Sequence, residues 1–193
     1  MLLETIILFL FSYFMGTFPS GFLYSKIFRK TDIRKLGSGS TGAMNVYRNT
    51  DKLGFLITIL ADILKGSIAM FVILKLLGTH EAISAFSGIL VILGHIYPVT
   101  MQFKGGKGLG PFLGIMLIVN WRVSTLGLIM IPIASTIFKN LTLGVLLMVI
   151  LTPIGVFASA QKPIETVGIT ISAILVFFAH RNNLKEILKS KNS

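Results

Sequence analysis

Long apolar runs alternate with short polar loops along this chain of 193 residues. We distinguish seven apolar segments, at roughly residues 2–25, 53–77, 82–102, 109–120, 123–138, 141–160 and 165–180. A helix needs about 20 residues to cross a bilayer, so most of these segments predict transmembrane helices. The fourth and fifth are short and interrupted by Gly or Pro, with Pro132 expected to break the fifth. Such segments favour non-ideal helices around a polar site, and a re-entrant pair is the weaker alternative.

Composition supports an all-α integral membrane protein with seven transmembrane helices in one domain, residues 1–193. The mean hydropathy is +0.84 and only 13% of residues are charged, whereas soluble domains carry about 25%. The N-terminal apolar run has Glu4 where a cleavable signal would carry basic residues, so we expect it to stay as a helix. The absence of cysteine excludes a thioester enzyme and cysteine metal ligands. No cluster of His and carboxylate residues predicts a metal site.

The basic residues predict the orientation in the membrane. Fourteen of the 18 Lys and Arg residues fall in one alternating set of loops, three fall in the other, and Lys65 lies within the second segment. Basic loops stay in the cytoplasm, so we expect the N-terminus outside and the C-terminus inside. The net charge of +11 then reflects orientation and attraction to anionic membrane lipids rather than binding to nucleic acid, for which no motif appears.

Three polar segments share the predicted cytoplasmic face: residues 32–49, 94–108 and 179–183. The first contains GSGSTG, in which the backbone around Ser38 and Gly39 resembles an anion nest. Asn45 and Arg48 are three residues apart, so on a helix they share a face, and Arg48 offers a bidentate cation. The alternative is a flexible surface loop with basic flanks.

The second segment ends in FKGGKG, where Gly105 and Gly106 would leave bare amides beside Lys104 and Lys107. Bare amides with cations suit an anion, although a basic loop that only sets orientation has the same composition. The spacing fails as a Walker A loop, which disfavours nucleotides. We interpret His95 as a packing residue.

In the third segment, His180 and Asn183 are spaced i, i+3 and would face the same way. A juxtamembrane end that snorkels to the lipid headgroups is the alternative. Asp62 and Lys65 within the second apolar segment are expected to pair and to fix the cytoplasmic loops. The chain has no nucleophile elbow and no obvious general base, so a reaction here would depend on positioning and on stabilising anionic charge.

Together the stretches GSGSTGAMN, GHIYP…FKGGKG and HRNN resemble the bacterial membrane glycerol-3-phosphate acyltransferases that use acyl phosphate. The resemblance implies acyl transfer from acyl phosphate to glycerol 3-phosphate without a cofactor, at the cytoplasmic face of the bacterial inner membrane. It implies that Ser38, Arg48 and Lys104 hold phosphate groups and that Gly105 and Gly106 donate to the oxyanion. It further implies that Lys107, His180 and Asn183 orient glycerol 3-phosphate, with His180 a candidate base. We therefore expect Lys104, His180 and Asn183 to be catalytic. The residues expected to bind the substrates are Ser38, Gly39, Asn45, Arg48, Gly105, Gly106 and Lys107. An enzyme that produces acyl phosphate is a possible partner.

The chain departs from the family pattern near this expected site, at Ser40, Met44, Pro111 and Glu186. Two alternatives therefore accompany the enzyme reading. One is a transporter or flippase for a phosphorylated or lipid anion, suggested by the two short segments. The other is an inactive relative with a different role in the membrane.

Overall fold

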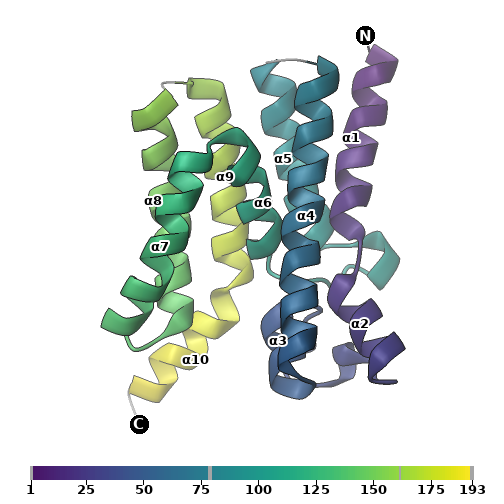
Figure 1. Ribbon diagram of the computed structural model, residues 1–193, viewed down its shortest axis with the longest axis vertical. Coiled ribbons are helices and arrows are strands. Elements are labelled where there is room, and N and C mark those ends of the chain that lie inside the picture. The colour runs from purple at the N-terminus through teal and green to yellow at the C-terminus, as the bar shows by residue number, and fades with distance from the viewer. Residues whose placement is uncertain (1, 78–79, 161, 192–193) are drawn as a thin grey trace.

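The computed structural model describes residues 2–77, 80–160 and 162–191, and all regular elements in these ranges are helices (Figure 1). They are α1 (Leu2–Thr17), α2 (Ser20–Phe28), η1 (Ile33–Lys35), α3 (Ala43–Asn49), α4 (Lys52–Leu77), α5 (Glu81–Ile96), η2 (Val99–Met101), α6 (Leu109–Val119), α7 (Trp121–Ile137), α8 (Leu141–Ala160), α9 (Pro163–Ala179) and α10 (Arg181–Lys191). The prediction of an all-α protein is confirmed. The two ends of the chain lie at opposite ends of the molecule (Figure 1).

Three helices of the described chain are long and apolar enough to cross a membrane: α4, α5 with its extension to Met101, and α8. The count rises to five if two bent pairs each form one span, α1 with α2 (41°) and α9 with α10 (47°). α6 and α7 are shorter apolar helices, at the positions where the sequence predicted short segments. Seven spans and their orientation stay a prediction.

Two details of the predicted segments are wrong. The first segment, 2–25, is two helices, because the chain bends after Thr17, where Pro19 supplies no backbone N–H for a continuous helix. Pro132, expected to break the fifth segment, lies inside the continuous helix α7.

Glycines let the long helices approach closely. A Cβ at Gly16 of α1 would lie 2.2 Å from the carbonyl oxygen of Val91 in α5, and one at Gly66 of α4 would lie 2.3 Å from that of Pro111 in α6. Only glycine fits at such distances, which is the usual device for packing helices where the hydrophobic effect does not drive them together.

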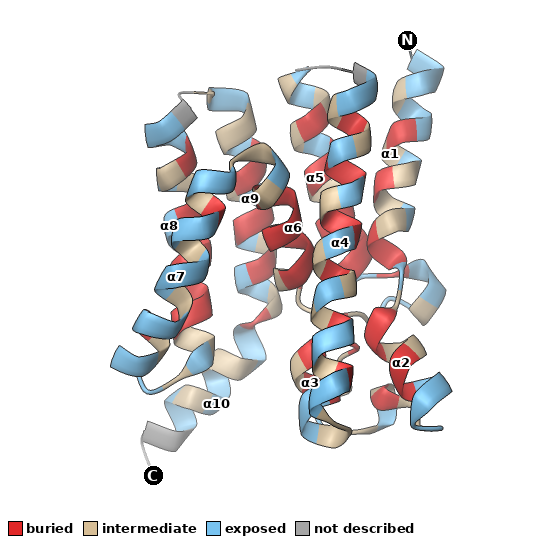
Figure 2. Ribbon diagram, viewed as in Figure 1, coloured by how far each residue is buried: buried red, intermediate tan, exposed pale blue. Residues whose placement is uncertain are grey.

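The short helix α6 lies at the centre of the bundle, with residues 110–116 buried. Its Phe112, Ile115 and Met116 join the core, to which α4, α5, α8 and α9 also contribute. Large apolar side chains, such as Leu3, Phe71 and Ile154, are instead exposed on the outer faces of the helices (Figure 2). An apolar exterior around a packed interior is what a surrounding bilayer requires.

Candidate functional site

A cavity of about 490 Å³ opens between α3 and α4 on one side and α7 and α8 on the other. Its apolar lining comes from Phe55, Ile59, Leu109, Leu113, Ile131, Leu141 and Val145. Its polar lining comes from Ser38, Ser40, Asn45, Arg48, Asp62, His95, Lys107, Lys139, Asn140, Thr142, His180 and Asn183. All three polar segments of the sequence therefore contribute side chains to one cavity, although they are far apart along the chain.

Lys107 reaches this cavity from the loop before α6 and donates a hydrogen bond to the side-chain carbonyl oxygen of Asn183 in α10. Burial lowers the pKa of Lys107, with the nearby Glu186 carboxylate opposing the shift and the Arg48 guanidinium adding to it. Two cations in one partly buried site form an anion-binding electrostatic environment, since both gain from a negative ligand.

His180 joins α9 to α10 and lies at the cavity with only 7% of its surface exposed. Its Nδ1 lies 2.8 Å from the carbonyl oxygen of Val176. A carbonyl only accepts, so Nδ1 carries the hydrogen, and in the neutral ring Nε2 is the nitrogen that can accept a proton.

Asn45, predicted to bind substrate, organises the loop that precedes it. Its Nδ2 donates to the backbone carbonyls of Leu36 (3.0 Å) and Ser40 (2.8 Å), and its Oδ1 accepts from the Ser38 backbone N–H (3.0 Å). The residue is 5% exposed. Its hydrogen-bonding groups are thus occupied by the protein, and its effect on a ligand passes through Ser38 and the loop.

The prediction that the glycine-rich loops leave bare amides is wrong in this structure. The amide of Gly39 donates to a carbonyl in its own turn, and that of Ser38 donates to Asn45. The amides of Gly105 and Gly106 donate to the last carbonyls of α5, at 3.2 and 3.0 Å. None of these four N–H groups is free to bind an anion, so the cavity offers side chains instead.

Lys104 is exposed and does not line the cavity, although it is only three residues from Lys107. Gly39, Gly105 and Gly106 also lie outside the lining. Six predicted site residues share the cavity: Ser38, Asn45, Arg48, Lys107, His180 and Asn183.

The sequence reasoning missed one wall of the cavity, the connection between α7 and α8. Lys139 and Asn140 line it together with Thr142. The Asn140 side chain accepts from the Thr142 N–H at 2.9 Å and so caps α8. Lys139 adopts φ 50°, a left-handed conformation uncommon outside glycine. A lone Lys-Asn pair between two apolar segments was the available signal, and it was counted only toward orientation.

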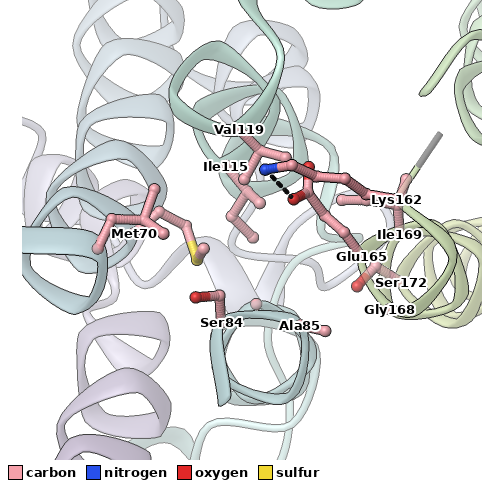
Figure 3. Close-up of a pocket in the computed structure, with 12 residues that line it drawn as sticks. Met70, Ser84, Ala85, Ile115, Val119, Lys162, Glu165, Gly168, Ile169 and Ser172 are labelled. Atoms are coloured by element: carbon pink, nitrogen blue, oxygen red, sulfur yellow. Dashed lines mark ion pairs between the residues drawn. The ribbon is translucent and has the colours of Figure 1, made fainter. Parts of the chain in front are cut away.

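A second cavity of about 90 Å³ lies at the other end of α4. Figure 3 shows the ion pair at its edge, in which the Lys162 ammonium and the Glu165 carboxylate are 3.4 Å apart. The rest of its lining is mostly apolar and includes none of the predicted site residues. Among the described residues, no group of three or more His, Asp or Glu side chains could hold a metal ion.

Fold and cavity define an all-helical membrane protein whose cavity is lined by both cationic and apolar side chains. The family model described as glycerol-3-phosphate acyltransferase matches residues 6–190. Relatives named glycerol-3-phosphate acyltransferase include one from Jannaschia sp. (strain CCS1), 35% identical over 94% of this chain and 88% of its own. Another, from Prochlorococcus marinus (strain MIT 9211), is 38% identical over 92% and 87%. The chain belongs to the glycerol-3-phosphate acyltransferase family.

Two solved structures have the same fold. Both are of PlsY (YgiH), described as an integral membrane glycerol 3-phosphate acyltransferase, and both are 27% identical to this chain, covering 97% of it and 93% of PlsY. The glycerol 3-phosphate form matches with a TM-score of 0.91 and the lysophosphatidic acid form with 0.86.

Proposed function

We propose that this acyltransferase moves a fatty acyl group from acyl phosphate to glycerol 3-phosphate, giving lysophosphatidic acid and inorganic phosphate in phospholipid synthesis. The observation that carries the proposal is the mixed lining of one cavity, in which Arg48, Lys107 and Lys139 share the space with apolar side chains. Both substrates carry phosphate and one also carries an acyl chain, so the cations and the apolar side chains of the cavity each have a matching ligand group.

Charge and position support a role for each polar side chain. Arg48 and Lys107 are the cations for the phosphate groups, and the Ser38 hydroxyl adds a donor beside Arg48. Asn183, which holds Lys107, and His180 orient glycerol 3-phosphate. The apolar lining residues of the cavity, which include Leu113, Ile131 and Val145, receive the acyl chain. The earlier catalytic assignment of Lys104 stays a prediction with no contact to this cavity.

The reaction needs little covalent help from the protein, because the acyl phosphate is already activated. A hydroxyl oxygen of glycerol 3-phosphate attacks the acyl carbonyl carbon and forms the ester bond. The bond from that carbon to the phosphate oxygen then breaks, and phosphate leaves with its electron pair. The hydroxyl proton passes to a substrate phosphate oxygen or, as the competing route, to Nε2 of His180. The cations stabilise the charge that gathers on the leaving phosphate.

Topology belongs to the same proposal. We take the chain as one domain with seven spans, the N-terminus outside and the C-terminus in the cytoplasm of a bacterium. Arg48, Lys107 and Lys139 belong to the basic loop set, so the cavity would open to the cytoplasmic face of the inner membrane. Glycerol 3-phosphate is water-soluble and acyl phosphate is amphiphilic, and this face gives access to both. An enzyme that supplies acyl phosphate remains a proposed partner.

The test is phosphate release by purified protein given acyl phosphate, with and without glycerol 3-phosphate. Release that depends on glycerol 3-phosphate, together with lysophosphatidic acid in the product, is the expected result. A folded protein without turnover would refute the enzyme reading and favour the inactive-relative or transporter alternatives. Lys107→Ala and Lys104→Ala form a matched pair from one loop: we expect the first to lose far more activity, since only Lys107 lines the cavity.

A further inference from the structure

A buried polar cluster lies at one wall of the cavity, where α2, α4 and α5 meet. The Asp62 carboxylate accepts from the Ser20 hydroxyl at 2.6 Å and lies 3.0 Å from the Lys65 ammonium. Lys65 also donates to the backbone carbonyl of Phe18 at 2.9 Å. Both charged side chains are 4% exposed. A buried ion pair held by such contacts keeps its members in one arrangement, since any other would leave a charge unpaired.

His95 of α5 lies between this cluster and the FKGGKG loop. Its Nδ1 is 3.8 Å from Asp62 Oδ1, and the residue is 6% exposed. The ring packs directly under Gly106: a Cβ at position 106 would lie 2.1 Å from His95 Nε2 and 2.7 Å from Cε1. The backbone carbonyl of His95 also accepts the Gly106 N–H at 3.0 Å. The loop therefore lies on His95 through both its backbone and its ring.

The same loop joins the two other parts of the site. The carbonyl oxygen of Gly105 accepts from the Thr41 N–H at 3.4 Å and from the Ser40 hydroxyl at 3.3 Å. The next residue after Gly106 is Lys107, whose ammonium reaches Asn183. A shift of the Gly105–Gly106 backbone would thus move Lys107, the cation proposed to bind substrate, together with the loop that carries Ser40 and Thr41.

From these contacts we infer that His95, which lies against Asp62 on one side and Gly106 on the other, is a positioning residue for the acyl transfer. The His95 ring fixes the position of the Gly106 backbone and so directs the next residue, Lys107, into the cavity. The inference rests on the proposed function, in which Lys107 binds substrate phosphate. It differs from a packing role because the effect on catalysis passes through one cation, and a displacement of about 1 Å at such a group can cost about a hundredfold in rate.

A compensating pair of substitutions tests the contact itself. Gly106→Ala places a methyl group into the His95 ring, whereas His95→Ala removes that ring. Each alone should reduce kcat/KM for glycerol 3-phosphate by about tenfold or more. The double variant should regain activity relative to Gly106→Ala, since the clash is gone. Gly105→Ala is the matched control: its methyl would lie 2.0 Å from the His95 carbonyl oxygen, which His95→Ala keeps, so the second substitution should not rescue it.

A double-mutant cycle with Lys107 tests the route. If His95 acts through Lys107, His95→Ala should raise KM for glycerol 3-phosphate in the wild-type background and add less than about twofold to Lys107→Ala. Thr58→Val is a control for a buried polar change one helical turn from Asp62, because Thr58 is fully buried without a hydrogen-bond partner among the described residues. It should leave KM unchanged.

The outcomes separate the two proposals. Wild-type protein without turnover would overturn the proposed function and, with it, this inference. Active wild-type protein with no rescue in the double variant would overturn the inference alone, and so would a full additional loss on Lys107→Ala. If Gly106→Ala does not yield monodisperse protein in detergent, the Lys107 cycle decides by itself, since neither His95→Ala nor Lys107→Ala introduces a clash.

Discussion

Asn45→Ala should disable the site although Asn45 has no polar group left for a substrate. The side chain holds the loop that carries Ser38 by three short hydrogen bonds, to the Ser38 N–H and to the carbonyls of Leu36 and Ser40, at 2.8–3.0 Å. Alanine removes all of them and leaves one amide and two carbonyls without this partner.

The size of the effect follows from those bonds. A neutral hydrogen bond contributes about 1 kcal/mol net, so the loop loses about 3 kcal/mol of ordering free energy. Since about 1.4 kcal/mol corresponds to a factor of ten, the population of the ordered loop falls by up to about a hundredfold. We expect a fall in kcat/KM for glycerol 3-phosphate of about tenfold to a hundredfold, the lower value applying if water replaces part of the network.

Asn45→Asp tests the acceptor and donor roles of the Asn45 side chain separately. Aspartate keeps an acceptor for the Ser38 N–H but cannot donate to the carbonyls of Leu36 and Ser40. It should therefore remain impaired, and its carboxylate would also weaken phosphate binding near Arg48.

The assay is phosphate release at varied glycerol 3-phosphate, with Asn49→Ala as the control. Asn49 also donates to Asn45, at 3.0 Å to Oδ1, but makes none of the three bonds to the loop. Wild-type kcat/KM in a folded Asn45→Ala protein would refute the reasoning, because the loop would then keep its geometry without these bonds. Equal losses in Asn45→Ala and Asn49→Ala would contradict it as well.

Three further predictions concern pH and packing. Burial lowers the pKa of Lys107, so this residue should lose its positive charge at a lower pH than a solvated lysine does. KM for glycerol 3-phosphate should rise at that lower pH, because the neutral amine no longer attracts the phosphate. Lys107→Arg should move that rise to higher pH, as read from a pH profile of KM. The Arg29 guanidinium lowers the pKa of Asp51 from 3.8 to about 2, so this carboxylate stabilises the fold at neutral pH and loses that effect as pH falls from about 4 to about 2. Asp51→Asn should lower the thermal midpoint at pH 7, and its difference from wild type should shrink over that acid range. Gly66→Ala, whose methyl would lie 2.3 Å from a carbonyl oxygen of α6, should yield little monodisperse protein, whereas Gly88→Ala, with no neighbour nearer than 3.7 Å, should yield a normal amount.

The apolar runs were sufficient to predict the main helices. α4 and α8 begin and end within about one residue of the predicted segments, because a bilayer-length run of apolar residues has few alternatives to a helix. The bend between α1 and α2 was missed for the same reason, since average hydropathy does not register a break of two residues. The bend at His180 fell at the end of a predicted segment and was read as its limit.

The sequence likewise predicted some features of the site and not others. Arg48, Lys107, His180 and Asn183 were predicted together because basic and polar side chains at one membrane depth can meet. The state of the backbone amides could not be predicted, because it depends on which distant carbonyl lies opposite. Nothing in FKGGKG indicates that the end of α5 supplies those carbonyls. Lys139 was missed because a single lysine in a loop is typical of orientation signals.

The reason why the site requires glycine differs from the reason in an anion nest. A nest uses glycine so that consecutive amides can point at a ligand, and alanine at such a position would still supply its N–H. Here Gly105 and Gly106 lie where a Cβ would be 2.0–2.1 Å from His95, and their amides are already bonded. The requirement is therefore space, as it is for Gly16 against α5. Alanine variants that lose activity while every amide remains present are expected from close packing, and they would be unexpected if the amides themselves bound the substrate.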